Sequence, residues 1–425
     1  MARITFLIEH EEGHLNPTFQ LARRLQARGH RVTYMGLADG GNYVRSQGFD
    51  FHPILEKLVP AGTLRTQREV AETVPGAGDS GAEIRVTQET GPDAIFRRSW
   101  LEMVKGDEGL TRVMSSLRPD LLLLTSFFAP HALVLRYRYG VPVVLLTPML
   151  RTYAKSHHAE LLGELLMDGG GAADFISLVQ RADPSVRRMD DIAARVMGLR
   201  EVILCPVDLE LPGERHDREP EVYYAEASVD LDRKSERAFS WDLLDPERKL
   251  LYVSLGSQSY RADRERVTAF LRATGQAFAG SPDWQVVLAT GGLLSREELA
   301  APAGTIVASW APQLDLLRRA RVAITHGGLG TVKECIFFGV PMVVFPLSHD
   351  QPDNARRVVH HGLGAQGDLG AFSRESIHGL VESADHPSVR ANMERMRQHF
   401  MEVEESGLAC RLIEEALPGG APAIG

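Results

Sequence analysis

Apolar runs of strand length alternate along the chain with stretches whose apolar residues recur at helical spacing. Residues 3–8, RITFLI, predict a buried strand, and residues 31–35, RVTYM, predict the next one. The stretch between them is amphipathic, and Asn16 and Pro17 predict its cap and first helical position while Gly29 predicts its end. Strand, helix and strand together form a βαβ unit, the building block of a parallel sheet.

The alternation continues through residues 119–124 and 141–146, and a second series of strands and helices begins near Lys249. Residues 206–220, between the two series, are dense in proline and charge, which is typical of a linker. We therefore predict an α/β protein with two doubly wound, Rossmann-like domains that face each other across a cleft, with ligands at the carboxyl ends of the strands. The predicted boundaries are residues 1–205 for the N-terminal domain, 206–235 for the linker region, 236–400 for the C-terminal domain, and 401–425 for a helix that could pack back on the N-terminal domain and a disordered tail.

Composition narrows the class of protein. The 425 residues are 44% hydrophobic and 24% charged, with a formal net charge of −9, which argues against a nucleic-acid surface as the main function. No run approaches about 20 apolar residues, the length that a membrane-spanning helix needs. A strand begins almost at Met1, and the cysteines Cys205, Cys335 and Cys410 have no CxxC spacing, so we expect a cytoplasmic protein without a leader peptide or a disulfide framework.

A glycine-rich segment, THGGLGTVKE at residues 325–334, follows an apolar strand. Its glycines predict a tight turn, and Thr331 predicts the start of a helix that closes at Gly339. Such a turn presents free backbone N–H groups and the positive end of a helix dipole, which suit a phosphate group. Thr331 and Glu334 are equally a capping box that would complete any helix, so this segment alone leaves both interpretations open. The Gly256-Ser257 turn ends another predicted strand and could also reach a phosphate.

Two strings look like metal motifs, and neither has the required context. HEEGH, from His10 to His14, matches the HExxH string of zinc peptidases, but it follows the first strand directly, contains Gly13 and precedes the predicted helix. Asp230-Leu231-Asp232 resembles a DxD motif but follows no clear strand. We therefore expect no metal. His14 remains at the tip of the first strand, either as a solvated polar residue or as a base that accepts a proton near neutral pH.

Two further pairs of residues follow strands of the second half. Trp310 could stack on a base, with the amide of Gln313 beside it, or it could be a half-buried structural tryptophan. Asp350 and Gln351 offer acceptors and an amide donor suited to sugar hydroxyls, or they could cap a helix.

Taken together, WAPQ, THGGLGTVKE, FGVPMVVFP and HDQPDNARRV resemble the donor-binding signature of the UDP-glycosyltransferases of GT-B fold. GHLNPTFQLARRLQARGHRV resembles the acceptor-domain signature of their bacterial antibiotic and macrolide glycosyltransferase branch. The resemblance covers both halves of the chain. It implies transfer of a hexose, with glucose expected first, from a UDP-sugar to a hydroxyl of a small apolar acceptor such as a natural product. The implied transfer is inverting and needs no metal and no cofactor besides the donor.

The resemblance also implies roles for individual residues. Trp310 would stack on the uracil, and Gln313 and Glu334 would hold the ribose. Asp350 and Gln351 would bind the sugar hydroxyls, and His14 would be the general base. The residues expected around the diphosphate are Ser257, His326, Gly328, Gly330 and Thr331. The acceptor pocket is expected between residues 55–100 and 150–183.

The chain departs from the family pattern beside the base. The family often pairs its base with an aspartate at the end of the PDLLLL strand, where this chain has Thr125 followed by Ser126. His14 would then work alone, be oriented by Thr125 or Ser126, or recruit a carboxylate such as Glu11 or Glu12.

Two other departures concern the donor side. Arg318-Arg319 stands where relatives often have a histidine, and Leu329-Gly330 replaces the Trp-Asn pair of the plant enzymes, which leaves one phosphate contact to backbone amides. Two alternatives to a transferase stay open on the sequence: a UDP-sugar epimerase of the same fold, and a nucleotide-sugar-binding protein without catalysis.

Overall fold

The computed structural model describes residues 1–64, 92–151, 153–167, 170–234, 239–256, 259 and 262–419. Its first sheet has the strand order β3-β2-β1-β4-β5-β6-β7, and every pair of neighbours is parallel. The strands are β1 (Arg3–Leu7), β2 (Arg31–Gly36), β3 (Phe51–Pro53), β4 (Leu121–Thr125), β5 (Val143–Thr147), β6 (Arg200–Ile203) and β7 (Val222–Tyr224).

The second sheet has the order β10-β9-β8-β11-β12-β13 and is also parallel. Its strands are β8 (Lys249–Ser254), β9 (Trp284–Ala289), β10 (Thr305–Ala308), β11 (Ala320–Thr325), β12 (Met342–Val344) and β13 (Gly364–Gln366). In both sheets the order reverses direction beside the first strand of the series, which creates the point where doubly wound folds bind ligands. The predicted fold class, two Rossmann-like α/β units, is confirmed.

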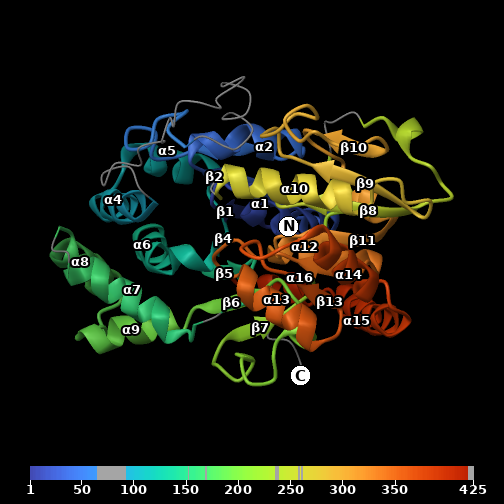
Figure 1. Cartoon of the computed structure of the whole chain (residues 1–425). Helices are drawn as coiled ribbons and strands as arrows, with labels where there is room; N and C mark the ends of the chain where they lie inside the picture. Colours follow the sequence, from blue (N-terminus) through green and yellow to red (C-terminus); the bar gives the residue numbers. More distant parts are fainter. Residues whose placement is uncertain are drawn as a thin grey trace.

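Helices cover both faces of each sheet, and Figure 1 shows α4 to α9 on the left and α14 and α15 on the right. Those of the first unit are α1 (Glu12–Ala27), α2 (Gly41–Ser46), α4 (Pro92–Lys105), α5 (Glu108–Leu117), α6 (Ala129–Tyr139), α7 (Ser156–Met167), α8 (Ala172–Ala182) and α9 (Met189–Met197). Those that follow are α10 (Arg264–Ala277), α11 (Gln313–Leu317), α12 (Leu329–Phe338), α13 (Gln351–His360), α14 (Arg374–Ala384), α15 (Pro387–Ser406) and α16 (Leu408–Glu415). Short 3-10 turns lie at Ala38–Gly40, Ser126–Phe128, Val207–Leu209 and Trp241–Leu243. No helix in these ranges is both long and apolar enough to cross a membrane.

The segment between the two sheets is packed against both of them. β7 lies within residues 206–235, the predicted linker region, and adds the last strand of the first sheet. One buried cluster runs from Ile203 and Leu209 to residues of β8, β11 and α12. The buried Lys333 of α12 donates to the backbone oxygens of Leu204, at 2.7 Å, and Ala227, at 2.8 Å. The two units are therefore joined by core contacts as well as by the chain.

The last helix, α16, returns to the first unit. Leu412 and Ile413 share a buried cluster with Phe6 and Phe19. Arg28, the C-cap of α1, also donates to Glu414, with 2.7 Å between Nε and Oε1. The exact division of the chain at residues 205 and 236 stays a prediction.

Candidate active site

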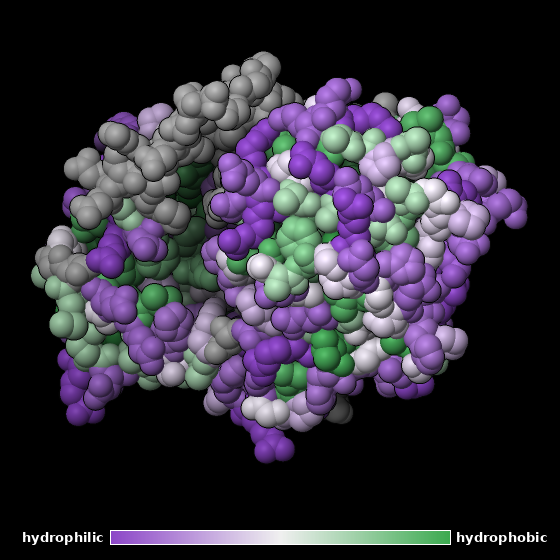
Figure 2. All heavy atoms as spheres, viewed as in Figure 1, coloured by the Kyte–Doolittle hydropathy of each residue, from purple (hydrophilic) through white to green (hydrophobic). Residues whose placement is uncertain are grey.

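The residues predicted to bind a ligand lie where strands of the two sheets end. Figure 2 shows a hollow between the two units, with hydrophobic atoms on part of its floor. β1 and β4 of the first sheet contribute His14 and Thr125, each located at or just after the carboxyl end of its strand. β11 and β12 of the second sheet lead into the glycine-rich turn and into Asp350.

His14 lies in the first turn of α1. The prediction that Asn16 and Pro17 begin this helix was wrong, because α1 starts at Glu12 and holds Pro17 in its interior. Proline removes the hydrogen bond to the carbonyl four residues earlier, which belongs to Gly13, and Gly13 is exposed to water. His10 precedes the helix, so the two histidines of the HEEGH string do not share a helical face.

The side chain next to His14 is Glu9, which the sequence analysis did not single out. Glu9 Oε2 lies 3.5 Å from His14 Nδ1, and the other oxygen, Oε1, accepts a hydrogen bond from Thr125 Oγ1 at 2.6 Å. The hydroxyl of Thr125 therefore holds the carboxylate of Glu9 by a hydrogen bond. Ser126 is buried beside Tyr153, and Phe127 packs on His14 with 5.5 Å between the ring centroids.

The charges around His14 raise its pKa above the ordinary value. Burial on its own lowers the pKa of the imidazole, but the interaction with the Glu9 carboxylate 3.5 Å away, with the charges of Glu11 and Asp350, outweighs it. Asp350 belongs to the second unit; burial raises its pKa, and its hydrogen bond with Asn354 and the charge of His14 act in the opposite direction. The two side chains thus interact electrostatically across the hollow.

The glycine-rich turn needs its glycines. Gly327 has a φ of 86°, and a Cβ there would lie 2.6 Å from Val344 Cγ1. α12 begins at Leu329 with Gly328 as its N-cap, so the prediction that Thr331 opens the helix was wrong. Among the described residues no side chain caps this end, and its first N–H groups point out of the helix without an intrahelical partner.

The capping-box interpretation of Thr331 and Glu334 was also wrong, because Glu334 bonds side chains. Its Oε2 accepts from Gln313 Nε2 at 2.5 Å, and its Oε1 accepts from Arg233 Nη1 at 2.7 Å. Gln313 Nε2 also lies 3.4 Å from Thr331 Oγ1. Trp310 is half-buried in the turn between β10 and α11, just before Gln313. Gln313, Thr331 and Glu334 are thus brought together, and Arg233, which was not predicted, joins them.

His326 is crowded by glycines. A Cβ on Gly256 would lie 2.3 Å from its Cε1, and a Cβ on Gly328 would lie 2.6 Å from its Nε2. This burial lowers the pKa of His326 to about 4, so its ring is neutral at pH 7 and offers an N–H rather than a charge. Gly330 has open space around it. Ser257, the remaining residue expected near the diphosphate, lies outside the described residues.

Asp350 is held by a network that reaches the linker. Its Oδ2 accepts from Asn354 Nδ2 at 2.9 Å, and the same amide donates to Gly327 O at 2.9 Å. Arg357, which is fully buried, donates to Asn354 Oδ1 at 3.0 Å and to Glu210 Oε1 at 2.7 Å. One network therefore fixes the glycine-rich turn and Asp350. The sequence analysis quoted the motif that contains Asn354 and Arg357 but gave them no role.

Gln351 is buried, and most of its acceptor capacity is already used. Its Oε1 accepts from the backbone N–H groups of Leu347, at 2.8 Å, and Ser348, at 3.0 Å. His349 between these residues and Asp350 has a φ of 58°, a left-handed conformation that is uncommon outside glycine. Gln351 therefore shapes the turn through its Oε1.

Other predicted features lie elsewhere. Asp230 of the DxD string bonds Arg23, with 3.1 Å between Oδ1 and Nε. Trp100, at the end of one predicted acceptor segment, is buried against Phe175, with ring centroids 5.3 Å apart. Residues 65–91, 152, 168 and 169 of the predicted acceptor segments lie outside the described residues.

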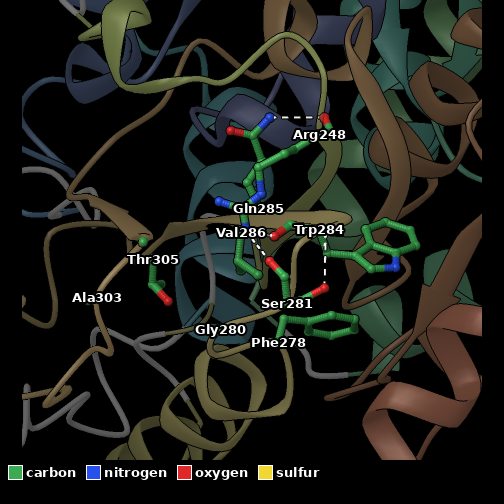
Figure 3. Close-up of a pocket in the computed structure, with 10 residues that line it drawn as sticks. Arg248, Phe278, Gly280, Ser281, Trp284, Gln285, Val286, Ala303 and Thr305 are labelled. Carbon is green, nitrogen blue, oxygen red and sulfur yellow. Dashed lines mark hydrogen bonds between the residues drawn. The ribbon is translucent and has the colours of Figure 1, made fainter.

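Figure 3 shows a separate cavity of about 140 Å³ at the amino ends of β9 and β10. None of the predicted site residues lines it. Its polar groups bond one another: Trp284 N donates to Ser281 Oγ at 3.2 Å, and Gln285 Nε2 donates to Arg248 O at 3.1 Å. Ligands of doubly wound folds bind at the opposite, carboxyl edge, so this cavity is not the candidate site.

Comparison with known proteins agrees with this geometry. Residues 230–398 match the family model described as UDP-glucoronosyl and UDP-glucosyl transferase. The oleandomycin glycosyltransferase of Streptomyces antibioticus is 28% identical over 96% of this chain and 89% of its own length. The demethyllactenocin mycarosyltransferase of Streptomyces fradiae is 26% identical over 99% of this chain and 88% of its own length.

Solved structures are similar over the whole chain. The glycotransferase of kitacinnamycin has a TM-score of 0.70 and 26% identity, covering 98% of this chain and 99% of its own. The calicheamicin glycosyltransferase CalG4 has a TM-score of 0.69 and 24% identity, covering 99% and 100%. The chain is therefore a glycosyltransferase with the GT-B fold, its residues 230–398 match the model of the UDP-glucoronosyl and UDP-glucosyl transferases, and its whole length is similar to glycosyltransferases that act in antibiotic biosynthesis.

Proposed function

We propose that this enzyme transfers a hexose, glucose in the first place, from a UDP-sugar to a hydroxyl of a small apolar natural product, with inversion and without a metal ion. The observation that carries the proposal is that each unit holds one polar side chain after the end of a strand: Glu9 Oε2 lies 3.5 Å from His14 Nδ1, Asn354 donates to Asp350 at 2.9 Å, and His14 and Asp350 are close enough for the charge of each to affect the pKa of the other. It supports a site in which a base from the first unit and a sugar-binding carboxylate from the second act on one substrate.

The donor would lie along the second unit. Trp310 would stack on the uracil, and the Gln313–Glu334 pair would bind the ribose hydroxyls, with Arg233 giving up its bond to Glu334 or sharing it. The uncapped start of α12 and the neutral His326 would donate to the diphosphate. Gly328, Gly330 and Thr331 would contribute backbone N–H groups and one hydroxyl.

The identities of the donor sugar and of the acceptor are proposed from two side chains and from the names of the relatives. Asp350 and the Nε2 of Gln351 favour a hydroxyl-rich hexose, because a deoxygenated sugar would leave these buried polar groups unpaired. The names of the relatives, one for oleandomycin and one for demethyllactenocin, support a natural-product acceptor. A similar structure at 18% identity was solved with dTDP, so UDP and dTDP donors belong in the same test.

The proposed chemistry is a single displacement. His14 takes the proton of the acceptor hydroxyl while that oxygen attacks the anomeric carbon. The bond between the anomeric carbon and the diphosphate oxygen breaks, and the nucleoside diphosphate leaves. The helix start and His326 stabilise the negative charge that develops on the leaving oxygen.

The test is a screen of UDP-glucose and dTDP-glucose against phenolic and macrolide acceptors, read by mass and by diphosphate release. His14→Ala should lose transfer by about 10²- to 10⁴-fold while calorimetry shows unchanged UDP binding. His10→Ala, which removes the other histidine of the same loop, is the control and should keep transfer. Full transfer activity in the His14→Ala variant would refute the role of His14 as the general base. Turnover of UDP-glucose alone into an epimer would overturn the transfer itself.

A further inference from the structure

The carboxylate that the family places at the end of β4 is absent, because Thr125 occupies that position. We propose that Glu9 replaces it: Glu9 orients His14 through Nδ1, and Thr125 clamps the far oxygen of Glu9. The inference rests on the proposed role of His14 as base. It assigns Glu9 and Thr125 as positioning residues, since both act through His14.

The sheet topology explains how Glu9 reaches this place. β1 and β4 are parallel neighbours, and Leu7 pairs with Leu124 in the register of the sheet. Glu9 follows the end of β1 by two residues, so it leaves the sheet beside Thr125, the last residue of β4. A carboxylate from either strand end can therefore occupy the same space.

The contacts agree with this arrangement. Thr125 Oγ1 donates to Glu9 Oε1 at 2.6 Å, which fixes the carboxylate and turns Oε2 toward His14. Glu9 Oε2 and His14 Nδ1 are both buried, and neither has a hydrogen-bond partner among the described residues. Their separation of 3.5 Å is slightly long for a hydrogen bond, and catalytic bonds of this kind often shorten when substrate binds. Closing this gap would pair two buried atoms that otherwise lack partners.

The pairing also determines which nitrogen of His14 is the base. A hydrogen bond to Glu9 requires the proton on Nδ1, so Nε2 keeps the lone pair that accepts the acceptor's proton. It also stabilises the imidazolium that forms when that proton arrives.

Other charged groups near His14 do not replace Glu9. Glu11, Asp350 and His10 also interact with His14 through charge, and Glu9 is the carboxylate whose oxygen lies 3.5 Å from His14 Nδ1. Asp350 is already bonded to Asn354. Glu9 is the carboxylate that a second side chain, Thr125, holds in place for this contact.

The first test needs no acceptor. In the full chain labelled at histidine, NMR should show His14 protonated on Nδ1 in its neutral form, and Glu9→Gln should lower the pKa of His14 by about 1. An unchanged His14 pKa in a folded Glu9→Gln variant would overturn the proposal.

The second test uses the transfer reaction with UDP-glucose and an acceptor from the screen above. Glu9→Gln should lower kcat by about 10- to 100-fold with little change in the KM for UDP-glucose, and the acid limb of the pH profile should move to lower pH. Thr125→Val, which keeps the shape and removes only the hydroxyl, should lower kcat by about fivefold.

A variant that moves the carboxylate from position 9 to position 125 distinguishes a role in orienting His14 from a role in folding. Glu9→Ala should be impaired, and adding Thr125→Asp should restore much of kcat, because it returns the carboxylate to the end of β4. If Glu9→Ala and Glu9→Ala/Thr125→Asp both fold and have the same kcat, the two strand ends do not place a carboxylate in the same position relative to His14. If His14→Ala is inactive while Glu9→Gln is fully active, only the role of Glu9 fails. If His14→Ala is active, the proposed base fails first.

Discussion

Replacing Arg357 with methionine should destabilise the enzyme far more than replacing Arg357 together with Glu210. The two side chains are both 0% exposed, with 2.7 Å between Nε and Oε1. They connect α13 to the segment that follows β6, and Arg357 also holds Asn354, the residue that fixes Asp350. The ion pair of Arg357 and Glu210 therefore stabilises the position of Asp350 as well as the core.

The magnitude follows from what each variant leaves behind. Arg357→Met leaves the Glu210 carboxylate buried without its charged partner, which costs about 3–5 kcal/mol in the free energy of unfolding. Asn354 Oδ1 also loses a donor, which adds about 1 kcal/mol. The double variant Glu210→Leu/Arg357→Met leaves neither charge of this ion pair in the core. Its free energy of unfolding should therefore lie within about 2 kcal/mol of that of the wild type.

Urea unfolding followed by tryptophan fluorescence measures this difference. The transition midpoints of wild type, Arg357→Met, Glu210→Leu and the double variant should be compared at equal slope, since a chain with two units need not unfold in one step. The double-mutant cycle should give a coupling of about 5 kcal/mol or more, because the two single variants together should cost about 7 kcal/mol or more and the double variant at most about 2 kcal/mol. The reasoning is refuted if Arg357→Met costs less than about 1 kcal/mol, or if the double variant is no more stable than Arg357→Met.

Three further outcomes follow from the donor side. Trp310→Ala should weaken UDP binding by about 10-fold or more in calorimetry, because stacking on a base contributes about 1–3 kcal/mol, and Trp310→Phe should keep most of it. Gly328→Ala should displace His326, since its Cβ would lie 2.6 Å from Nε2, and lower both stability and UDP affinity, whereas the thermal midpoint of Gly330→Ala should not fall, because nothing lies within 4 Å of a Cβ there. His326 should stay neutral down to pH about 4 in an NMR titration. Because its pKa is lowered by folding, its contribution to stability is complete above the unfolded pKa and decreases as the pH falls, and a His326→Asn variant should lack that part of the pH dependence in chemical unfolding.

The fold was predictable because its signal is repeated many times. The central strands of a doubly wound sheet are buried on both faces, so they appear in the sequence as apolar runs, and amphipathic helices separate the runs. β4, for example, is entirely buried, and its four leucines were recognised as a strand. Errors in one boundary therefore did not change the number or type of elements that define the fold.

The boundaries of helices were less predictable, because local signals competed. Asn16 and Pro17 form a typical helix start, yet α1 begins at Glu12, because the packing of Leu15 in the core outweighs the loss of one backbone bond at an exposed glycine. Thr331 and Glu334 match a capping box, but Glu334 is drawn to Gln313 and Arg233, which come from other parts of the chain. Only the tertiary structure reveals such partners.

The candidate site was predictable where one continuous motif carries it. Within the segment from Trp310 to Glu334, Gln313 contacts Thr331 and Glu334, and the binding of a ligand by these residues stays a prediction. Asn354 and Arg357 could have been found, since residues three and four positions apart on a helix share a face with Asp350 and with each other. Arg233 gave no such signal, because it reaches Glu334 from about 100 residues away.

Glu9 illustrates how the orienting role of an aspartate expected at the end of β4 could be filled by another residue. A base needs a carboxylate at one point in space, and in a parallel sheet two neighbouring strand ends border that point. Glutamate is one methylene longer than aspartate, so it can reach the point from beyond the end of β1, provided that β4 ends in a residue small enough to leave room. Thr125 satisfies this condition and adds a hydroxyl that bonds the carboxylate. The proposed pair of Glu9 and Thr125 would thus supply from the end of β1 the carboxylate that the resemblance places at the end of β4.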